Sequence, residues 1–188
     1  MRKLFETKVK ATNLPQPDSV TCQSACVAMT LGYPKEKIRT VRAELVARGL
    51  AGSPGNMGNF IQARIGNRYS FELAASINQM AAWLQAGEFL ITHGWFTRSG
   101  HVICLDAVEI DQKTLGVRFS VKDPWAEFDF PAWRYLPGAN FYDGFYSSLG
   151  IYAACVAGQS PGHSFNLYKA GKFDPARPGA WVHRIRPA

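Results

Sequence analysis

The chain has 188 residues, of which 47% are hydrophobic and 19% are charged. This balance excludes an intrinsically disordered chain, and the length fits a single domain over residues 1–188. The longest strictly apolar run covers residues 151–157, whereas a membrane-spanning helix needs about 20 residues, so no span is expected. Residues 1–8 are charged and lack an apolar core, which predicts no secretory signal peptide and a protein that is cytoplasmic as made.

The net charge is +7, from 21 basic and 14 acidic residues. Such a balance favours an anionic partner, and a bacterial cell wall is one candidate. The basic residues are spread thinly, which argues against a nucleic-acid-binding arm, and solubility alone is the other interpretation of the charge. Four cysteines are too few for a disulfide scaffold, so we expect them to be reduced.

The first half of the chain reads mainly as helices. Two prolines make residues 1–21 an irregular or extended lead-in, and a helix is expected over 22–31. A second helix opens at Pro34 and ends at Gly49. Several glycines make residues 50–70 a loop with one helical turn at most, whereas an apolar stripe predicts a helix over 71–86.

The second half changes to strands. Short segments rich in β-branched or aromatic residues predict three strands, over residues 88–94, 101–110 and 115–122. Residues 111–113 are expected to form the hairpin turn between the last two. The aromatic-rich residues 131–188 read as an extension of the same domain, with strands at 146–156 and 180–185. Helices followed by an antiparallel sheet indicate the α+β class rather than alternating βαβ units.

Cys22 stands where the lead-in turns into the first helix. The unpaired N–H groups of a helix N-terminus favour a thiolate, which is the nucleophilic form of cysteine. The alternative is that Cys22 is simply a small buried hydrophobic residue.

His101 opens one predicted strand and Asp123 ends the next. If these strands pair, the Asp123 carboxylate lies beside the His101 ring, where it would fix the tautomer and stabilise an imidazolium. The Gln16 amide could donate into an oxyanion hole together with the Cys22 backbone N–H.

These segments resemble a known family. Residues 16–29, QPDSVTCQSACVAM, are similar to the opening motif of cysteine peptidase family 39, the papain-like peptidases that remove double-glycine leaders from bacteriocins, and of its stand-alone relatives. Residues 80–91, 100–103 and 121–124 resemble the family's helix–Gly–strand, His and Asp blocks. The resemblance covers about residues 14–130. It implies a papain-like fold, Cys22 as nucleophile, His101 and Asp123 as its partners, Gln16 in the oxyanion hole, and no cofactor.

Other residues compete for these roles. His93 ends a strand and is a second candidate base at the cleft, whereas His163 reads as a surface loop residue and His183 as a strand surface residue. Asp111 is a further candidate for the acid, and Asp106 lies too far along its strand to touch His101.

The other cysteines read as packing. Cys26, one turn after Cys22, should face inward, and Cys104 and Cys155 should be core residues. Cys22, Cys26, His101 and Cys104 could also be read as a zinc set, but residues three apart on a strand face opposite sides, so no metal is expected.

The combined expectation is a monomeric cysteine-dependent amide hydrolase that works through a thioester. The peptide part of a bacterial cell wall is the favoured substrate, reached after release from the cell. A polypeptide cut at small residues is the alternative. A binding module without catalysis, on the same frame, is the third interpretation, and it predicts an unreactive Cys22 thiol.

Overall fold

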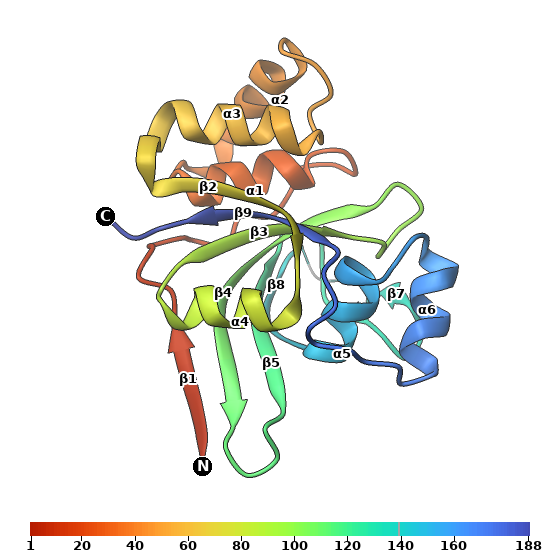
Figure 1. Ribbon diagram of the computed structural model, residues 1–188. Coiled ribbons are helices and arrows are strands. Elements are labelled where there is room, and N and C mark those ends of the chain that lie inside the picture. Colours follow the sequence, from red (N-terminus) through yellow and green to blue (C-terminus); the bar gives the residue numbers. More distant parts are fainter. Residues whose placement is uncertain (139) are drawn as a thin grey trace.

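The computed structural model describes residues 1–138 and 140–188. Its centre is an antiparallel sheet with the strand order β2-β9-β3-β4-β5-β8 (Figure 1). These strands are β2 (Tyr69–Ala75), β9 (Ala180–Ile185), β3 (Phe89–Gly94), β4 (His101–Asp111), β5 (Val117–Asp123) and β8 (Tyr142–Ser147). A further strand, β1 (Arg2–Glu6), pairs with the outer half of β4. The α+β class is confirmed, as are the strands predicted near residues 88–94, 101–110, 115–122 and 180–185.

Helices cover both faces of this sheet (Figure 1). One face carries α1 (Cys22–Thr30), α2 (Ile38–Val46) and α3 (Pro54–Ile65). The other carries α4 (Ile77–Gln85) and the helical segment α5 (Ser148–Ile151) with η3 (Tyr152–Val156). The remaining elements are η1 (Lys35–Lys37), η2 (Gly66–Arg68), the short pair β6 (Phe128–Asp129) and β7 (Arg134–Tyr135), and α6 (Pro161–Lys169).

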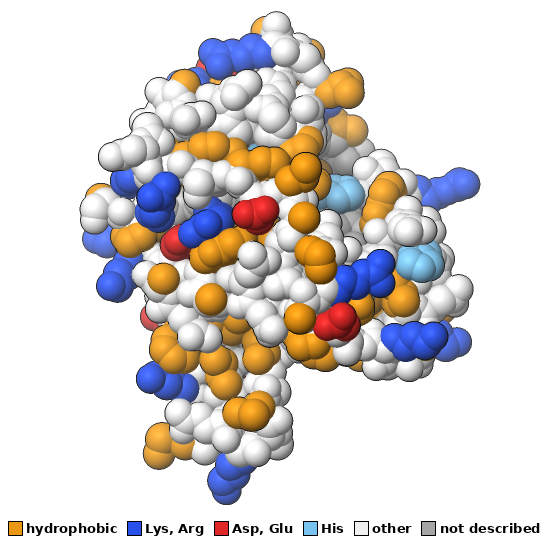
Figure 2. Space-filling view, in the orientation of Figure 1, with side chains coloured by type: hydrophobic (Ala, Val, Ile, Leu, Met, Phe, Trp, Pro, Cys, Tyr) orange, Lys and Arg blue, Asp and Glu red, His pale blue; other side chains and the backbone are white. Residues whose placement is uncertain are grey.

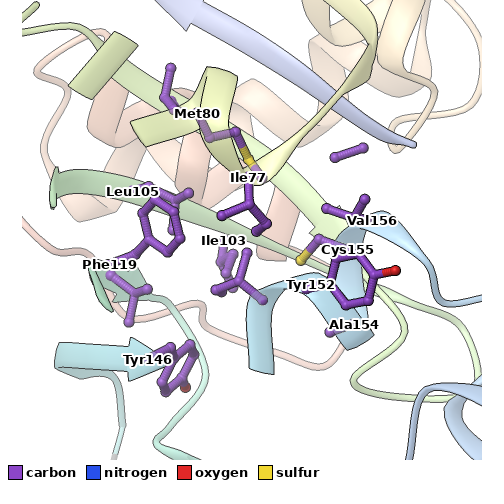
Figure 3. Packing of buried hydrophobic residues seen from close by; sticks show 14 of the residues in the cluster. Ile77, Met80, Ile103, Leu105, Phe119, Tyr146, Tyr152, Ala154, Cys155 and Val156 are labelled. Carbon is purple, nitrogen blue, oxygen red and sulfur yellow. The ribbon is translucent and has the colours of Figure 1, made fainter. Parts of the chain in front are cut away.

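Side-chain alternation along the central strands divides the core into two clusters. On β4, Ile103 and Leu105 pack with α4 and η3, whereas Val102 and Cys104 pack with α1 to α3. Figure 3 shows the first cluster, in which Ile77 and other α4 side chains lie beside the sheet residues. Because both faces are covered, β3 and the first half of β4 are mostly buried on both sides.

The region 50–75 departs from the sequence prediction in two places. Residues predicted as loop form α3, with Pro54 in its first turn. Its Gly58 is required by close packing, since a Cβ there would lie 2.2 Å from Tyr69 Oη. Gly58 therefore serves close helix packing rather than a loop. The helix predicted over 71–86 is also wrong in its first part, because residues 69–75 form the edge strand β2.

The boundary between β2 and α4 is set by a capping box. Ser76 Oγ accepts from Gln79 N at 3.2 Å, and Gln79 Oε1 accepts from Ser76 N at 2.9 Å. This Ser-x-x-Gln pattern starts the helix at Ile77 and leaves residues 69–75 free to pair with β9.

The strand predicted over 146–156 is wrong. The strand β8 ends at Ser147, whose hydroxyl accepts from Gly150 N at 3.1 Å and caps α5. The apolar run that follows is helical and buried, and a short apolar run alone does not separate a strand from a buried helix. Across the described chain, every helix is too short or too polar to cross a membrane.

Candidate active site

Helix α1 is fixed against the start of β4. The Cys26 thiol donates to the Val102 carbonyl at 3.4 Å, with both residues buried. Cys22 lies one turn before Cys26, and His101 lies one residue before Val102, so the same contact brings Cys22 and His101 together. Both line a cavity of about 230 Å³, which we call the cleft. The cleft therefore lies between the N-terminus of α1 and the first residue of β4.

The contact predicted between His101 and Asp123 is present. The antiparallel pairing of β4 and β5 places the end of β5 beside the start of β4. The His101 Nε2–H donates to Asp123 Oδ1 at 2.8 Å, and the two side chains are almost completely buried, with 5% and 0% of each residue exposed. With Nε2 engaged, Nδ1 is the ring nitrogen that remains for Cys22.

Asp123 accepts three further hydrogen bonds, two of them from tyrosines that the sequence did not indicate. Tyr135 Oη and Tyr146 Oη donate to Oδ2 at 3.1 and 3.2 Å, and the Trp125 backbone N–H donates to Oδ1 at 3.0 Å. The Tyr135 ring also packs edge-on against the His101 ring, with centroids 5.4 Å apart. These donors hold a buried carboxylate in place and satisfy its oxygens.

The electrostatics of the cleft favour a thiolate beside an imidazolium. Burial raises the pKa of the Cys22 thiol, but the hydrogen bond to His101 and its charge outweigh burial and bring the net pKa below the ordinary value. Burial lowers the pKa of His101, but the charge and hydrogen bond of Asp123, together with Cys22, raise it to about 10. The Cys22 thiol also contacts Gln23 Oε1 at 3.3 Å.

Gln16 reaches the cleft, as the sequence analysis expected. Its side chain lines the same cavity as Cys22, and its backbone N–H donates to the Pro124 carbonyl at 2.8 Å. The side-chain Nε2 donates to the Asp18 carbonyl at 2.6 Å, which leaves its second N–H for a ligand. The oxyanion role of Gln16 stays a prediction.

The competing histidines occupy other environments. His93 lies between Trp181 and Trp95, and burial lowers its pKa to about 4, so it is neutral at physiological pH. His183 lies on β9 but is fully buried, which corrects its prediction as a surface residue; its Nδ1 lies 2.8 Å from Tyr69 Oη. His163 belongs to helix α6 rather than to a surface loop.

Three other cysteines are buried as predicted, namely Cys26, Cys104 and Cys155. Asp106 is engaged by Ser120 Oγ at 2.6 Å and Lys122 Nζ at 3.1 Å, away from His101. Asp111 caps the hairpin turn by accepting from Lys113 N at 2.9 Å. Over residues 1–138 and 140–188, no three His, Cys, Asp or Glu side chains gather as a metal-ligand set.

Comparison with known proteins adds no assignment: no family model matches the chain, and no curated protein matches it.

Proposed function

We propose that this protein is a cysteine-dependent amide hydrolase of the papain-like type, with Cys22 as nucleophile, His101 as general base and acid, and Asp123 as the residue that orients His101. The observation that carries the proposal is the buried 2.8 Å bond between His101 and Asp123 beside a thiol at the start of α1. Papain-like is also the fold that the resemblance to cysteine peptidase family 39 implies.

The reaction begins with proton transfer from Cys22 to His101. The thiolate attacks the amide carbonyl carbon, and the Cys22 N–H and the Gln16 amide receive the oxyanion. His101 then gives its proton to the leaving amine, which leaves a thioester on Cys22. Water, deprotonated by His101, hydrolyses the thioester and restores the thiol. Asp123 stays ionised and keeps the ring oriented.

The substrate that we propose is the peptide part of a bacterial cell wall. The support is the net charge of +7, because the wall is anionic. Figure 2 shows Lys and Arg side chains spread over one face of the molecule, with fewer acidic side chains among them. A surface of this kind favours contact with an extended anionic polymer.

The test is mass spectrometry of products released from purified cell-wall sacculi by the wild type and by Cys22→Ala. We expect the wild type to release muropeptides and the variant to release none, and the fragment masses would identify the cleaved bond. Release by neither protein would reject the wall as substrate. Equal release by both would reject Cys22 as nucleophile.

A further inference from the structure

A second, larger cavity adjoins the cleft. It has a volume of about 600 Å³ and shares Gln16 and Trp125 with the cleft. Its outer wall carries Lys35 and Arg39, together with Glu36. We call this cavity the basic groove. Because the same two residues border both cavities, the basic groove lies directly beside the cleft.

The two cations lie on one face of a continuous helical segment. Lys35 belongs to η1 and Arg39 to the first turn of α2, four residues later, and this spacing places side chains side by side. Both residues are exposed, and among the residues that the structure describes neither forms an ion pair with a carboxylate. Glu36 offsets one of the two positive charges, so this side of the basic groove keeps a net positive charge.

The opposite wall is rigid and offers polar and aromatic contacts. Two prolines flank Gln16, and the Gln16 N–H bond to the Pro124 carbonyl ties this loop to the segment of Trp125. Trp125 is 38% exposed and presents an apolar surface to both cavities, and Asn140 completes the lining. A lining with a fixed aromatic and amide side and two exposed cations suits an extended peptide with an anionic group.

We infer that the basic groove binds a carboxylate-bearing segment of the peptide substrate, next to the bond that Cys22 attacks. This inference rests on the proposed function for its substrate class. Lys35 and Arg39 would receive a side-chain or terminal carboxylate, while Trp125 covers the aliphatic part of the same segment. Peptides of bacterial walls carry such free carboxylates, whereas a neutral peptide would leave both cations without a partner.

The test measures binding without turnover. Immobilised Cys22→Ala protein is offered two synthetic peptide mixtures of equal length, one with Glu at the positions where the other has Gln, and mass spectrometry quantifies the retained peptides. We expect the Glu mixture to be retained about fivefold better, an upper value for one exposed charge pair. Equal retention of the mixtures, or retention of neither, would overturn the inference.

Matched variants in the Cys22→Ala background separate the groove from general charge. Arg39→Glu should abolish the preference for the Glu mixture over the Gln mixture, and Glu36→Gln should increase that preference. Lys37→Glu, on the same segment but outside the groove lining, should leave it unchanged although it alters the net charge as much as Arg39→Glu does. Arg39→Glu places an acid in the first turn of α2, which favours the helix, and Arg39→Gln serves as a second variant with a smaller loss. Loss of preference in Lys37→Glu as well would overturn the groove as the site.

The inference and the proposed function fail in different ways. Preference for the Glu mixture without release from sacculi would support the basic groove and reject the cell wall as substrate. Release of muropeptides without any preference for the Glu mixture would support the proposed hydrolase and reject the basic groove as a carboxylate-binding site.

Discussion

The reactivity of Cys22 depends on one neighbouring ring. His101 holds a proton up to a pKa of about 10 and lowers the pKa of the thiol, against burial, which raises it. These opposite shifts favour a thiolate–imidazolium pair at pH values below the ordinary thiol pKa. A non-catalytic binding module has no need of such a pair.

Iodoacetamide alkylation, mapped to Cys22 by peptide mass spectrometry, should thus proceed at pH values well below the ordinary thiol range. His101→Asn removes the favourable charge that faces the thiol, so the alkylation midpoint of Cys22 should rise above the ordinary value because burial then dominates. His163→Asn, on α6, should leave the midpoint where the wild type has it. A wild-type midpoint at or above the ordinary thiol pKa would contradict the activated pair and favour the binding module.

Tyr135 is the clearest residue to test around Asp123, since its hydroxyl donates to the carboxylate at 3.1 Å. A hydrogen bond to a charged group contributes about 1.5–3 kcal/mol, so Tyr135→Phe should lower the initial rate of muropeptide release by at least about tenfold. The control is Tyr142→Phe, because the Tyr142 hydroxyl accepts from Phe145 N and does not contact Asp123. An unchanged rate in Tyr135→Phe would show that Asp123 needs no such support.

The residues of the candidate site divide into those that local sequence indicates and those that it does not. Cys22, His101 and Asp123 each stand at the end of a predicted element, so pairing of neighbouring strands was enough to predict the His101–Asp123 contact. Tyr135 lies on β7, which pairs with β6 outside the central sheet, and Tyr146 lies on β8, which pairs with β5; the aromatic-rich segment thus brings both hydroxyls to Asp123. The sequence spacing of these residues does not predict their contact with Asp123, and the same aromatic residues could equally be hydrophobic core residues.

At the level of elements, the turn between β3 and β4 sets the position of His101. Gly100 has a φ of +75°, and a Cβ there would lie 1.8 Å from His93 Nε2. The ring of His93 thus occupies the space that a side chain at position 100 would need. The glycine permits both the left-handed turn and the close packing just before the strand that carries His101.

Gly100→Ala should therefore destabilise the fold. The left-handed conformation costs roughly 1–2 kcal/mol for a residue with a Cβ, which for a domain of this size corresponds to a melting temperature lower by about 2–8 °C, and the contact with His93 adds to it. Gly162→Ala, in helix α6 with open space around its Cβ position, is the control and should be neutral or slightly stabilising. Thermal unfolding followed by circular dichroism measures both, and an unchanged value for Gly100→Ala would contradict this account.

Strands with clear alternation or β-branched runs were predicted well, whereas elements defined by packing were not. Helix α3 was hidden by its glycines, of which Gly58 packs against Tyr69. Strand β2 was merged with α4 because its edge position leaves Phe71 and Leu73 exposed. The Ser76 capping box was the local signal that could have separated them. The helical run after Ser147 has the composition of a buried strand, and only tertiary packing decides its form.

For the whole molecule, the net charge of +7 should govern adsorption to an anionic wall. In a pelleting assay with sacculi, Cys22→Ala should be retained at low salt and largely released near 1 M salt, where the Debye length is about 3 Å. Arg39→Glu and Lys37→Glu should weaken adsorption to a similar extent, in contrast to their expected difference in peptide preference. Retention that does not respond to salt would contradict an electrostatic basis for adsorption.

The position of β9 has a consequence for synthesis on the ribosome. Residues 180–185 pair with β2 on one side and β3 on the other, so both strands keep an open edge until these residues have been made. A nascent chain that already contains Cys22, His101 and Asp123 still lacks the strand that joins β2 to β3. We expect released chains truncated before residue 180 to be cut rapidly by added protease, and released chains that include residues 180–185 to resist it. The sheet beneath the cleft would then be complete only after residues 180–185 have been made, well after the three candidate site residues.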